Sequence, residues 1–321
     1  MRDYLAREVP VAMKRVGGMQ NPPSSSRPAA RAASSRTERF VVASFPEKEG
    51  GDMGKLENVV IAGKSGAGKQ PRVDVLVKEF GLTQLGTGNI FREYLGALKK
   101  LERQPDPEQF WDAKADWFVD DGKIRVAIKA DSSRAGVPID DAVLGLKAAR
   151  FVNRGLFVPD RITNDLFAAA FAKLGHSGAI LDGYPRTTDQ SKFLMDLLKK
   201  AGKRLDLVLV VDGDDADILR RTLGRRICPK KECGKVFHVE FKPPRDGKFC
   251  TACGAEVILR SDDSEEKIRS RLREFQEKAK PAVDWLAAQG VKVASVNGNL
   301  PKFSDEIVRQ SVLDALRSVG L

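Results

Sequence analysis

Histidine, tryptophan and tyrosine are scarce in this chain, and no long apolar run occurs in it. Among 321 residues there are two histidines, three tryptophans and three tyrosines. With so few imidazoles, catalysis by a histidine general base has little support. No stretch approaches the roughly 20 apolar residues of a membrane-spanning helix, so no membrane span is predicted. The hydrophobic (42%) and charged (31%) fractions are those of a globular chain with a sizeable core.

Cysteine is also rare, and its positions are confined to one segment. The four cysteines are Cys228, Cys233, Cys250 and Cys253. Disulfide frameworks spread cysteines along a chain, whereas one tight cluster is typical of a metal site in a reducing compartment. The spacing C-x4-C, sixteen residues and C-x2-C predicts a tetrahedral zinc site of structural type with four cysteine ligands. Zinc would stabilise a flap, residues 227–259, whose hydrophobic core is too small for it to fold without the metal. Two disulfides or unliganded thiols are the alternatives.

Negative charge is outweighed by positive charge, which is unevenly placed. The chain has 55 Lys and Arg against 44 Asp and Glu, and residues 1–45 alone hold eight basic and three acidic residues. The Arg, Ser, Ala and Pro bias of residues 13–44 is typical of a cleavable organelle-targeting peptide, with a disordered tail as the alternative. It favours the chloroplast stroma over the mitochondrial matrix. The remaining charge predicts an anionic partner: nucleic acid, anionic membrane or phosphorylated small molecules.

Short apolar runs alternate with helical patterns from residue 55 onward. Buried strands are expected at residues 58–62, 179–181, 207–211 and 291–296. Helices are expected at residues 72–80, 160–174, 190–200, 216–223, 265–288 and 304–319. This alternation predicts an α/β fold with a parallel sheet covered by helices on both faces. Two segments, 93–136 and 227–259, interrupt it.

A glycine-rich loop follows the first expected strand and precedes a helix. Its sequence, GKSGAGK at residues 63–69, and its context are those of a phosphate-binding P-loop. Backbone N–H groups would wrap a phosphate at the helix N-terminus, and Lys69 would lie against the β- and γ-phosphates. A glycine-rich turn that binds nothing is the alternative. The predicted ATP-binding residues are Gly63, Gly66, Ala67, Gly68 and Lys69.

The two residues after this lysine depart from the motif. A Ser or Thr normally follows directly or one place later, but this chain has Gln70 and Pro71. Proline has no N–H, so one amide expected to hold a phosphate is missing, although the first helical turn tolerates proline. One lost charge-assisted hydrogen bond costs about 1.5–3 kcal/mol. We expect phosphate binding to be weakened rather than abolished.

Three further motifs follow in order. They are LGTGNIFR at 85–92, GLFVPD at 155–160 and LDGYPR at 181–186. Arginines flank the cysteine segment at positions 221, 225, 226, 260, 269 and 271. With the phosphate loop, these motifs resemble the adenylate kinases, nucleoside monophosphate kinases whose long form has a zinc-binding lid. The resemblance extends from residue 56 to the C-terminus apart from 93–136. It implies a P-loop NTPase-type fold, Mg²⁺ with the nucleotide, and ATP and AMP as substrates.

The resemblance also implies roles for individual residues. AMP binding falls to Thr87, Arg92, Leu156, Val158, Gly183, Arg186 and Gln190. Arg221 would face the adenine of ATP, and Asp182 would order waters on Mg²⁺. The catalytic residues implied around the transferring phosphates are Lys69, Arg186, Arg225, Arg260 and Arg271, together with Asp182. Phosphoryl transfer needs such cations, because it depends on positioning and on stabilising spread negative charge. Asn89, where the family usually has Asp, leaves Asp182 with less help.

The resemblance divides the chain into parts. The P-loop core would comprise 55–92, 160–226 and 260–321, the AMP-binding region 93–159, and the zinc lid 227–259. Between Arg92 and Val158 there are 65 residues, of which about forty, residues 93–136, are extra to the family. Within this insertion, helical spacing would place on one face the aromatic residues Phe110, Trp111, Trp117 and Phe118. They would pack on the parent domain or dock on a partner protein.

The sequence therefore predicts an adenylate kinase that converts MgATP and AMP to two ADP and balances adenylates in an organelle. The alternative is a weakened or inactive kinase-like subunit with a structural or regulatory role in an assembly, which Gln70, Pro71, Asn89 and the insertion favour. Nucleic acid is not expected as a partner. Binding it would need aromatics interleaved with basic residues, and the lid offers only Phe237, Phe241 and Phe249.

Overall fold

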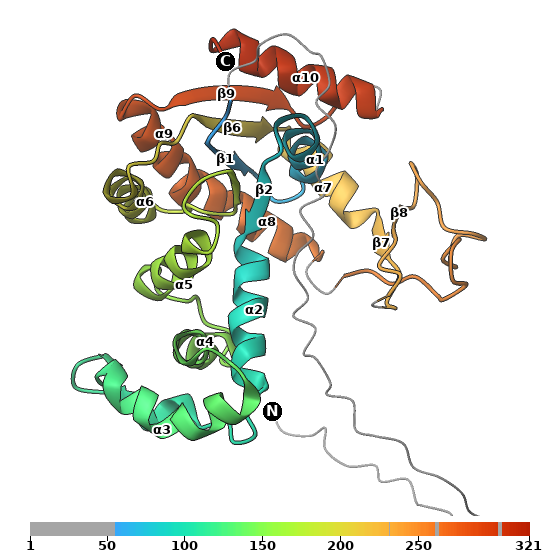
Figure 1. The fold of residues 1–321 in the computed structure, drawn as a ribbon. Coiled ribbons are helices and arrows are strands. Elements are labelled where there is room, and N and C mark those ends of the chain that lie inside the picture. Colours follow the sequence, from blue (N-terminus) through green and yellow to red (C-terminus); the bar gives the residue numbers. More distant parts are fainter. Residues whose placement is uncertain (1–54, 231, 261–262, 301–303) are drawn as a thin grey trace, which may run out of the picture. The chain divides into compact units, whose positions relative to one another are not determined.

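The computed structural model describes residues 55–230, 232–260, 263–300 and 304–321 (Figure 1). The targeting segment expected at 1–45 lies outside these residues and stays a prediction. No helix in the described part of the chain combines the length and the apolar character of a membrane-spanning segment.

Five parallel strands form the central sheet (Figure 1). Their spatial order is β2 (Thr83–Gly86), β5 (Ala179–Asp182), β1 (Asn58–Gly63), β6 (Leu207–Asp212) and β9 (Lys292–Asn297). The four strands expected from their apolar runs are confirmed within one or two residues. The edge strand β2 was missed, because its four residues, of which Thr83 is exposed and only Gly86 is buried, leave no apolar run.

Helices cover both faces of the sheet, because alternate strand residues point to opposite sides. Val59 and Ile61 of β1 pack against α1 (Lys69–Phe80) and α10 (Asp305–Ser318). Val60, between them, belongs to the core on the other face, built from α2 (Thr87–Lys99), α4 (Ile139–Val152), α5 (Asp160–Ala172), α6 (Thr188–Ala201) and α9 (Lys280–Ala288). The predicted α/β class with a helix-flanked parallel sheet is confirmed.

The helix expected at 265–288 is divided in the structure. It comprises α8 (Glu265–Glu274), a π-helical turn (Phe275–Ala279) and α9. Pro281, in the first turn of α9, has no N–H to donate to the carbonyl four residues earlier and its ring crowds that carbonyl. The wider turn directly before it relieves this conflict. The expected helix at 216–223 is present as α7 (Asp215–Leu223).

The insertion differs from the helix expected for its aromatic residues. They lie on a 3-10 turn (Pro107–Phe110) and a two-stranded ribbon of β3 (Trp111–Asp112) and β4 (Trp117–Phe118). Asp112 forms the connecting turn by accepting from the N–H groups of Lys114 and Ala115. The one-faced helical spacing was therefore wrong. The helix of the insertion, α3 (Asp121–Ala135), begins after the ribbon and buries Ile124 and Ile128.

Packing of these aromatics on the parent domain is what the structure shows. Phe110 and Phe118 are buried, and the Trp111 ring meets the Phe151 ring of α4 edge-on with centroids 6.0 Å apart. The Arg150 guanidinium lies 3.3 Å above the Trp111 centroid. A partner protein for the insertion stays a prediction.

Candidate active site

The sheet brings three motifs together at the carboxyl ends of its strands. In the parallel register Asp182 lies opposite Ile61 of β1 on one side and Gly86 of β2 on the other. The phosphate loop, the start of α2 and the loop after β5 therefore all leave the sheet at the carboxyl ends of neighbouring strands. This crevice is the usual ligand site of open α/β sheets.

The phosphate loop is shaped by its glycines. Gly63 has φ 141° and lies so close to β6 that a Cβ there would be 2.3 Å from the carbonyl oxygen of Val211. Gly68 adopts the left-handed conformation, φ 89°, as N-cap of α1. Lys69 is the first residue of α1, and its Nζ donates to the carbonyl oxygens of Gly63 (2.8 Å) and Lys64 (3.0 Å). Burial lowers the pKa of Lys69, and Asp182 opposes this shift.

Pro71 is the third residue of α1. The first N–H groups of a helix have no partner within the helix, so proline costs this helix no hydrogen bond. The fold therefore tolerates Pro71, as expected. The same position has no N–H to offer a phosphate at the helix N-terminus.

A pocket of about 650 Å³ opens above this edge of the sheet. Its walls bring together residues predicted from four separate parts of the chain: Gly63, Lys69, Thr87, Arg92, Asp182, Gly183, Arg186, Arg225, Arg260 and Arg271. With Lys278, seven cations face only two carboxylates, Asp182 and Glu274. Such an excess of positive charge suits polyanionic ligands. Their individual roles stay predictions.

Other predicted residues lie outside the lining of this pocket. The Arg221 guanidinium donates to the carbonyl oxygens of Gly66 and Gly298, both at 3.1 Å, so it braces the phosphate loop. Gly66, Ala67 and Gly68 belong to that loop behind the pocket wall. Leu156, which is 52% exposed, and Val158 lie between α4 and α5.

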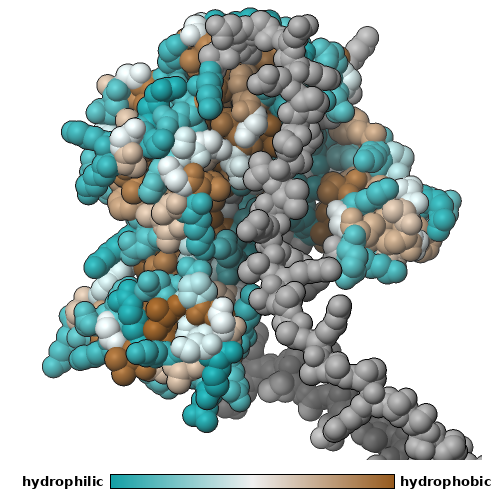
Figure 2. Space-filling model, in the orientation of Figure 1, coloured by the Kyte–Doolittle hydropathy of each residue, from teal (hydrophilic) through white to brown (hydrophobic). Residues whose placement is uncertain are grey.

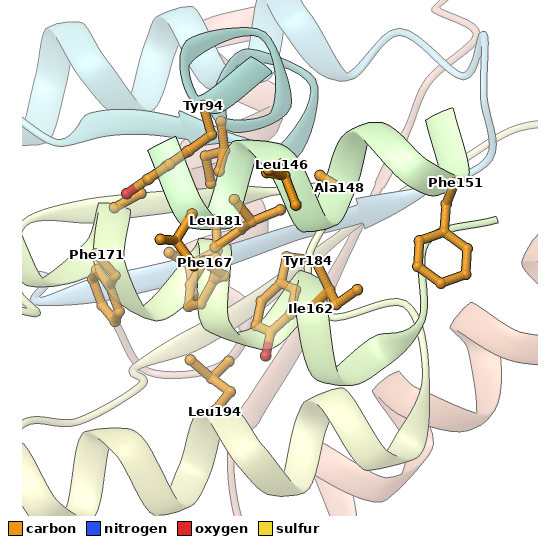
Figure 3. Packing of buried hydrophobic residues seen from close by; sticks show 14 of the residues in the cluster. Tyr94, Leu146, Ala148, Phe151, Ile162, Phe167, Phe171, Leu181, Tyr184 and Leu194 are labelled. Carbon is orange, nitrogen blue, oxygen red and sulfur yellow. The ribbon is translucent and has the colours of Figure 1, made fainter. Parts of the chain in front are cut away.

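Gln190 is buried, and both ends of its amide form hydrogen bonds with the protein. Its Oε1 accepts from the backbone N–H of Arg186 at 2.7 Å, and its Nε2 donates to Asp160 Oδ1 at 2.7 Å. In this state it positions the loop that carries Arg186. Tyr184 of the same loop stacks on Phe167 with ring centroids 3.9 Å apart, as Figure 3 shows. A packed core thus holds the loop in place.

Sequence reasoning missed several residues that contribute to the site. Gln84, Glu274, Phe275 and Lys278 line the pocket. Arg72 is fully buried and donates to the carbonyl oxygens of Gly68 (3.1 Å) and Asn297 (2.8 Å) beneath the loop. Only Gln84 carried a usable signal, since it directly precedes the LGTGNIFR motif. Glu274, Phe275 and Lys278 reach the site at the π-helical turn between α8 and α9. Arg72 reaches it through packing beneath the loop.

Asn89 does not replace the carboxylate usual at its position. Its Oδ1 accepts a hydrogen bond from Arg92. A Cβ on Gly86 would lie 3.8 Å from Asn89 Nδ2 and 3.9 Å from Asp182 Oδ2, so the amide nitrogen occupies the side toward Asp182. Asn89 therefore presents a donor where a metal-bound water needs an acceptor, and it also orients Arg92.

Asp182 suits a role beside Mg²⁺. Its Oδ2 accepts from Gln84 Nε2 at 2.9 Å. Its Oδ1 accepts no hydrogen bond from any residue that the structure describes. Asp182 lines the pocket beside Lys69, so this oxygen can hold a metal-bound water near bound phosphates.

Arg225 connects the pocket to the lid. It begins β7 (Arg225–Ile227), which pairs with β8 (Val236–His238) of the lid. Its guanidinium forms a two-pronged pair with Asp263, which is fully buried, with nitrogen–oxygen distances of 2.8 and 2.6 Å. Such bidentate geometry fixes the plane of the guanidinium. The strand pairing and this ion pair therefore connect the lid to a cation in the pocket wall.

The four cysteine sulfurs form one cluster in the lid. All four Sγ atoms lie within 4.8 Å of one another, with Cys228 and Cys253 3.4 Å apart and Cys233 and Cys250 3.6 Å apart. A tetrahedral ion with Zn–S bonds of about 2.3 Å separates its sulfurs by about 3.8 Å. The contacts join one knuckle to the other, as a shared ion requires. The cluster therefore fits zinc.

The electrostatics of two thiols differ. Burial opposes ionisation of Cys250, but the backbone N–H groups of Ala252 and Cys253 and the neighbouring thiols outweigh it and lower its pKa to about 6. Burial raises the pKa of Cys228 to about 12. One ready thiolate gives a metal ion an initial ligand, and the positive charge of the bound metal ion then favours loss of the protons from the other thiols.

Comparison with known proteins agrees with this geometry. The family model described as adenylate kinase matches residues 130–291. The adenylate kinase of Salinispora tropica is 34% identical over 261 residues, which cover 81% of this chain and 98% of that protein. That of Bacillus cytotoxicus is 31% identical over 75% of this chain and 91% of its own length, and that of Caldicellulosiruptor bescii 28% over 82% and 99%. The chain belongs to the adenylate kinase family and is a nucleoside monophosphate kinase.

Proposed function

We propose that this enzyme transfers the γ-phosphoryl group of MgATP reversibly to AMP, giving two ADP. The observation that carries the proposal is the pocket in which Lys69 and five arginines meet beside Asp182. Two polyanions approach each other only where such charge offsets their repulsion. The arginines provide forked donors that suit phosphate oxygens.

The reaction needs little covalent participation by the protein. The phosphates of ATP lie along the phosphate loop at Lys69, and Arg92 and Arg186 hold the phosphate of AMP. An oxygen of AMP attacks the γ-phosphorus in line as the bond to the β–γ bridging oxygen breaks, and the β-phosphate of ADP takes up the electron pair. Arg225, Arg260 and Arg271 stabilise the charge on the transferring group. Mg²⁺ bound with ATP would supply further positive charge beside the phosphates, and Asp182 would hold its waters.

We also propose a structural Zn²⁺ in the lid and a role in balancing adenylates within an organelle. The fit of the four thiols supports the ion. The composition of residues 1–45 supports import, with the chloroplast stroma favoured over the mitochondrial matrix.

The first test is coupled-assay turnover of the chain with MgATP and AMP, beside a Pro71→Thr variant. We expect clear wild-type turnover and a gain of about tenfold to a hundredfold in kcat/KM for Pro71→Thr, because a restored charge-assisted hydrogen bond is worth about 1.5–3 kcal/mol. Pro71→Ala is the matched control, since it restores the N–H without the hydroxyl. Equal melting temperatures would show that the fold is unchanged.

A second candidate function is a weakened or inactive kinase-like subunit, and the missing N–H at Pro71 favours it. Under this alternative the folded, zinc-loaded wild type shows no turnover with AMP or another nucleoside monophosphate as acceptor. Activity that appears only in Pro71→Thr would overturn the catalytic proposal and support the structural or regulatory role.

Asn89→Asp is expected to lower the free Mg²⁺ concentration for half-maximal activity by about tenfold, the effect of one added charge-assisted interaction. Aspartate keeps an oxygen for Arg92 and replaces the amide nitrogen toward Asp182 with an acceptor for metal-bound water. Turnover measured against free Mg²⁺ checks this. Asn89→Ala is the control: it loses the contact to Arg92 and should raise the KM for AMP instead. An unchanged or higher Mg²⁺ requirement in Asn89→Asp would contradict the argument.

A further inference from the structure

Two glutamines link the phosphate loop to Asp182. Gln70 and Gln84 form a reciprocal amide pair, in which Gln70 Nε2 donates to Gln84 Oε1 at 3.1 Å and Gln84 Nε2 donates to Gln70 Oε1 at 3.3 Å. At one end Gln70 Nε2 also donates to Asp74 Oδ1 at 2.9 Å, and at the other Gln84 Nε2 donates to Asp182 Oδ2 at 2.9 Å.

The orientation of both amides is fixed by these ends. An ionised carboxylate only accepts hydrogen bonds, so each NH2 group must face its aspartate. Each amide then has one N–H and its oxygen left for the other amide. Reversing either amide would set an oxygen against a carboxylate. The four side chains therefore form one connected chain of hydrogen bonds with a single consistent arrangement.

The position of this hydrogen-bond series beside the phosphate pocket indicates a role in the site. Gln70 follows Lys69 directly in the first turn of α1, where a Ser or Thr normally follows the lysine directly or one place later. Gln84 lies on the edge strand β2, and Asp182 ends the neighbouring strand β5. Gln70, Gln84 and Asp182 all line the phosphate pocket. An ordinary surface amide pair would not have a carboxylate of the phosphate pocket as its last acceptor.

We propose that Gln70 and Gln84 are positioning residues for the metal-bound nucleotide. Gln84 holds Asp182 so that its Oδ1 faces the waters of Mg²⁺, and Gln70 ties this orientation to the phosphate-loop helix. The pair thus compensates in part for the hydroxyl missing after Lys69 and for Asn89. This proposal rests on the proposed function, which supplies the magnesium nucleotide. Misplacing a site group by about 1 Å can cost about a hundredfold, so an exposed amide can matter here.

The test measures binding without turnover. Isothermal titration calorimetry gives the Kd of a non-hydrolysable ATP analogue with Mg²⁺ and with EDTA, and the ratio of the two is the metal-dependent gain in affinity. We expect Gln84→Leu, which keeps the shape but loses the donors, to reduce this gain about tenfold, and Gln70→Leu by a smaller factor. The Kd in EDTA should stay within about twofold of wild type, since the amides act through the metal.

The double variant and a matched control sharpen the result. Because Gln70 acts only through Gln84, Gln70→Leu/Gln84→Leu should lose no more of the gain than Gln84→Leu alone. Gln310→Leu is the control: Gln310 Nε2 donates to Asp314 Oδ1 at 2.7 Å on exposed α10, the same kind of contact away from the pocket. It should leave both Kd values unchanged.

Three outcomes would overturn the inference. They are a wild type with no metal-dependent gain, a gain that survives in Gln84→Leu, and losses that are equal with Mg²⁺ and with EDTA. The fate of the proposed function is separate. Turnover by a wild type whose glutamine variants bind normally would leave the kinase proposal standing and remove only the positioning role. If the wild type shows no turnover but its metal-dependent gain in affinity is lost in the glutamine variants, the positioning role stands and the kinase proposal falls.

Discussion

Arg186→Ala is expected to lower turnover with MgATP and AMP on the order of 10³-fold, the range in which arginines that stabilise phosphoryl transfer act. The guanidinium lies in the pocket wall, and its Nε donates to the carbonyl oxygen of Gly183 at 2.9 Å, which directs the remaining donors toward bound phosphate. Alanine removes the charge that, in the proposed mechanism, holds the phosphate of AMP beside the transferring group. The effect should appear mainly in kcat, with a smaller rise in the KM for AMP.

The fold should survive this substitution. Arg186 is exposed, and the Gln190 side chain binds its backbone N–H, which alanine keeps. Arg317→Ala is the matched control, because Arg317 is an exposed arginine of α10 paired with Asp314 at 3.0 Å and lies outside the pocket wall. Both variants should melt within a few degrees of wild type. Full activity in Arg186→Ala would show that the pocket does not transfer phosphoryl groups in the proposed way.

Sequence reasoning was most successful where a local pattern determines local structure. The apolar runs at β1, β5 and β6 have no stable place except a sheet buried on both faces, so their positions could be predicted. The edge strand β9 buries only alternate residues, Ala294 and Val296, but its apolar residues still marked it. The edge strand β2 is half exposed and gives no such signal. The P-loop glycines were equally readable, because Gly63 and Gly68 adopt conformations that other residues avoid.

The rest of the site depends on contacts between distant segments. Gln84 meets Gln70 only because β2 lies at the sheet edge beside α1, and no spacing in the sequence reports that. Arg221 is another example: the resemblance implied a place at the adenine of ATP, which stays a prediction, but nothing in the sequence indicated that its guanidinium donates to the carbonyl oxygens of Gly66 and Gly298. The aromatics of the insertion have helical spacing, yet the turn at Asp112 folds them into a ribbon. Tertiary packing decided each case.

Removal of zinc is expected to unfold the lid while the P-loop core stays folded. The buried core of the lid consists of Cys228, Phe237 and Cys250, and apolar side chains such as Phe241 and Ile258 remain exposed. Figure 2 shows apolar atoms, coloured tan and brown, on the surface of the lid. So small a core cannot offset the entropy of ordering about thirty residues, so the ion supplies the difference. Because Arg225 and Arg260 border the lid, turnover should fall on the order of a hundredfold or more, as misplaced charges do.

Metal content and limited proteolysis check this expectation. Wild type should contain one zinc per chain and resist trypsin. A strong chelator, or Cys250→Ser, should expose cleavage at lid residues such as Lys235, Arg245 and Lys248 and leave core fragments intact. Added zinc should restore resistance and turnover after chelation but not in Cys250→Ser. Thr251→Ala, an exposed change between two ligands, should behave as wild type.

The two alternatives to zinc, disulfides and free thiols, predict different results in these measurements. Two disulfides would lower the mass of the chain by four hydrogens, leave no zinc, and make protease resistance sensitive to a thiol reductant rather than a chelator. Free thiols without a metal would leave the lid indifferent to both. Since the sulfurs of the two knuckles lie 3.4 and 3.6 Å apart across the cluster, a shared ion can bind all four without moving the backbone. A lid that resists trypsin after complete zinc removal would overturn the argument, because its few buried side chains would then suffice.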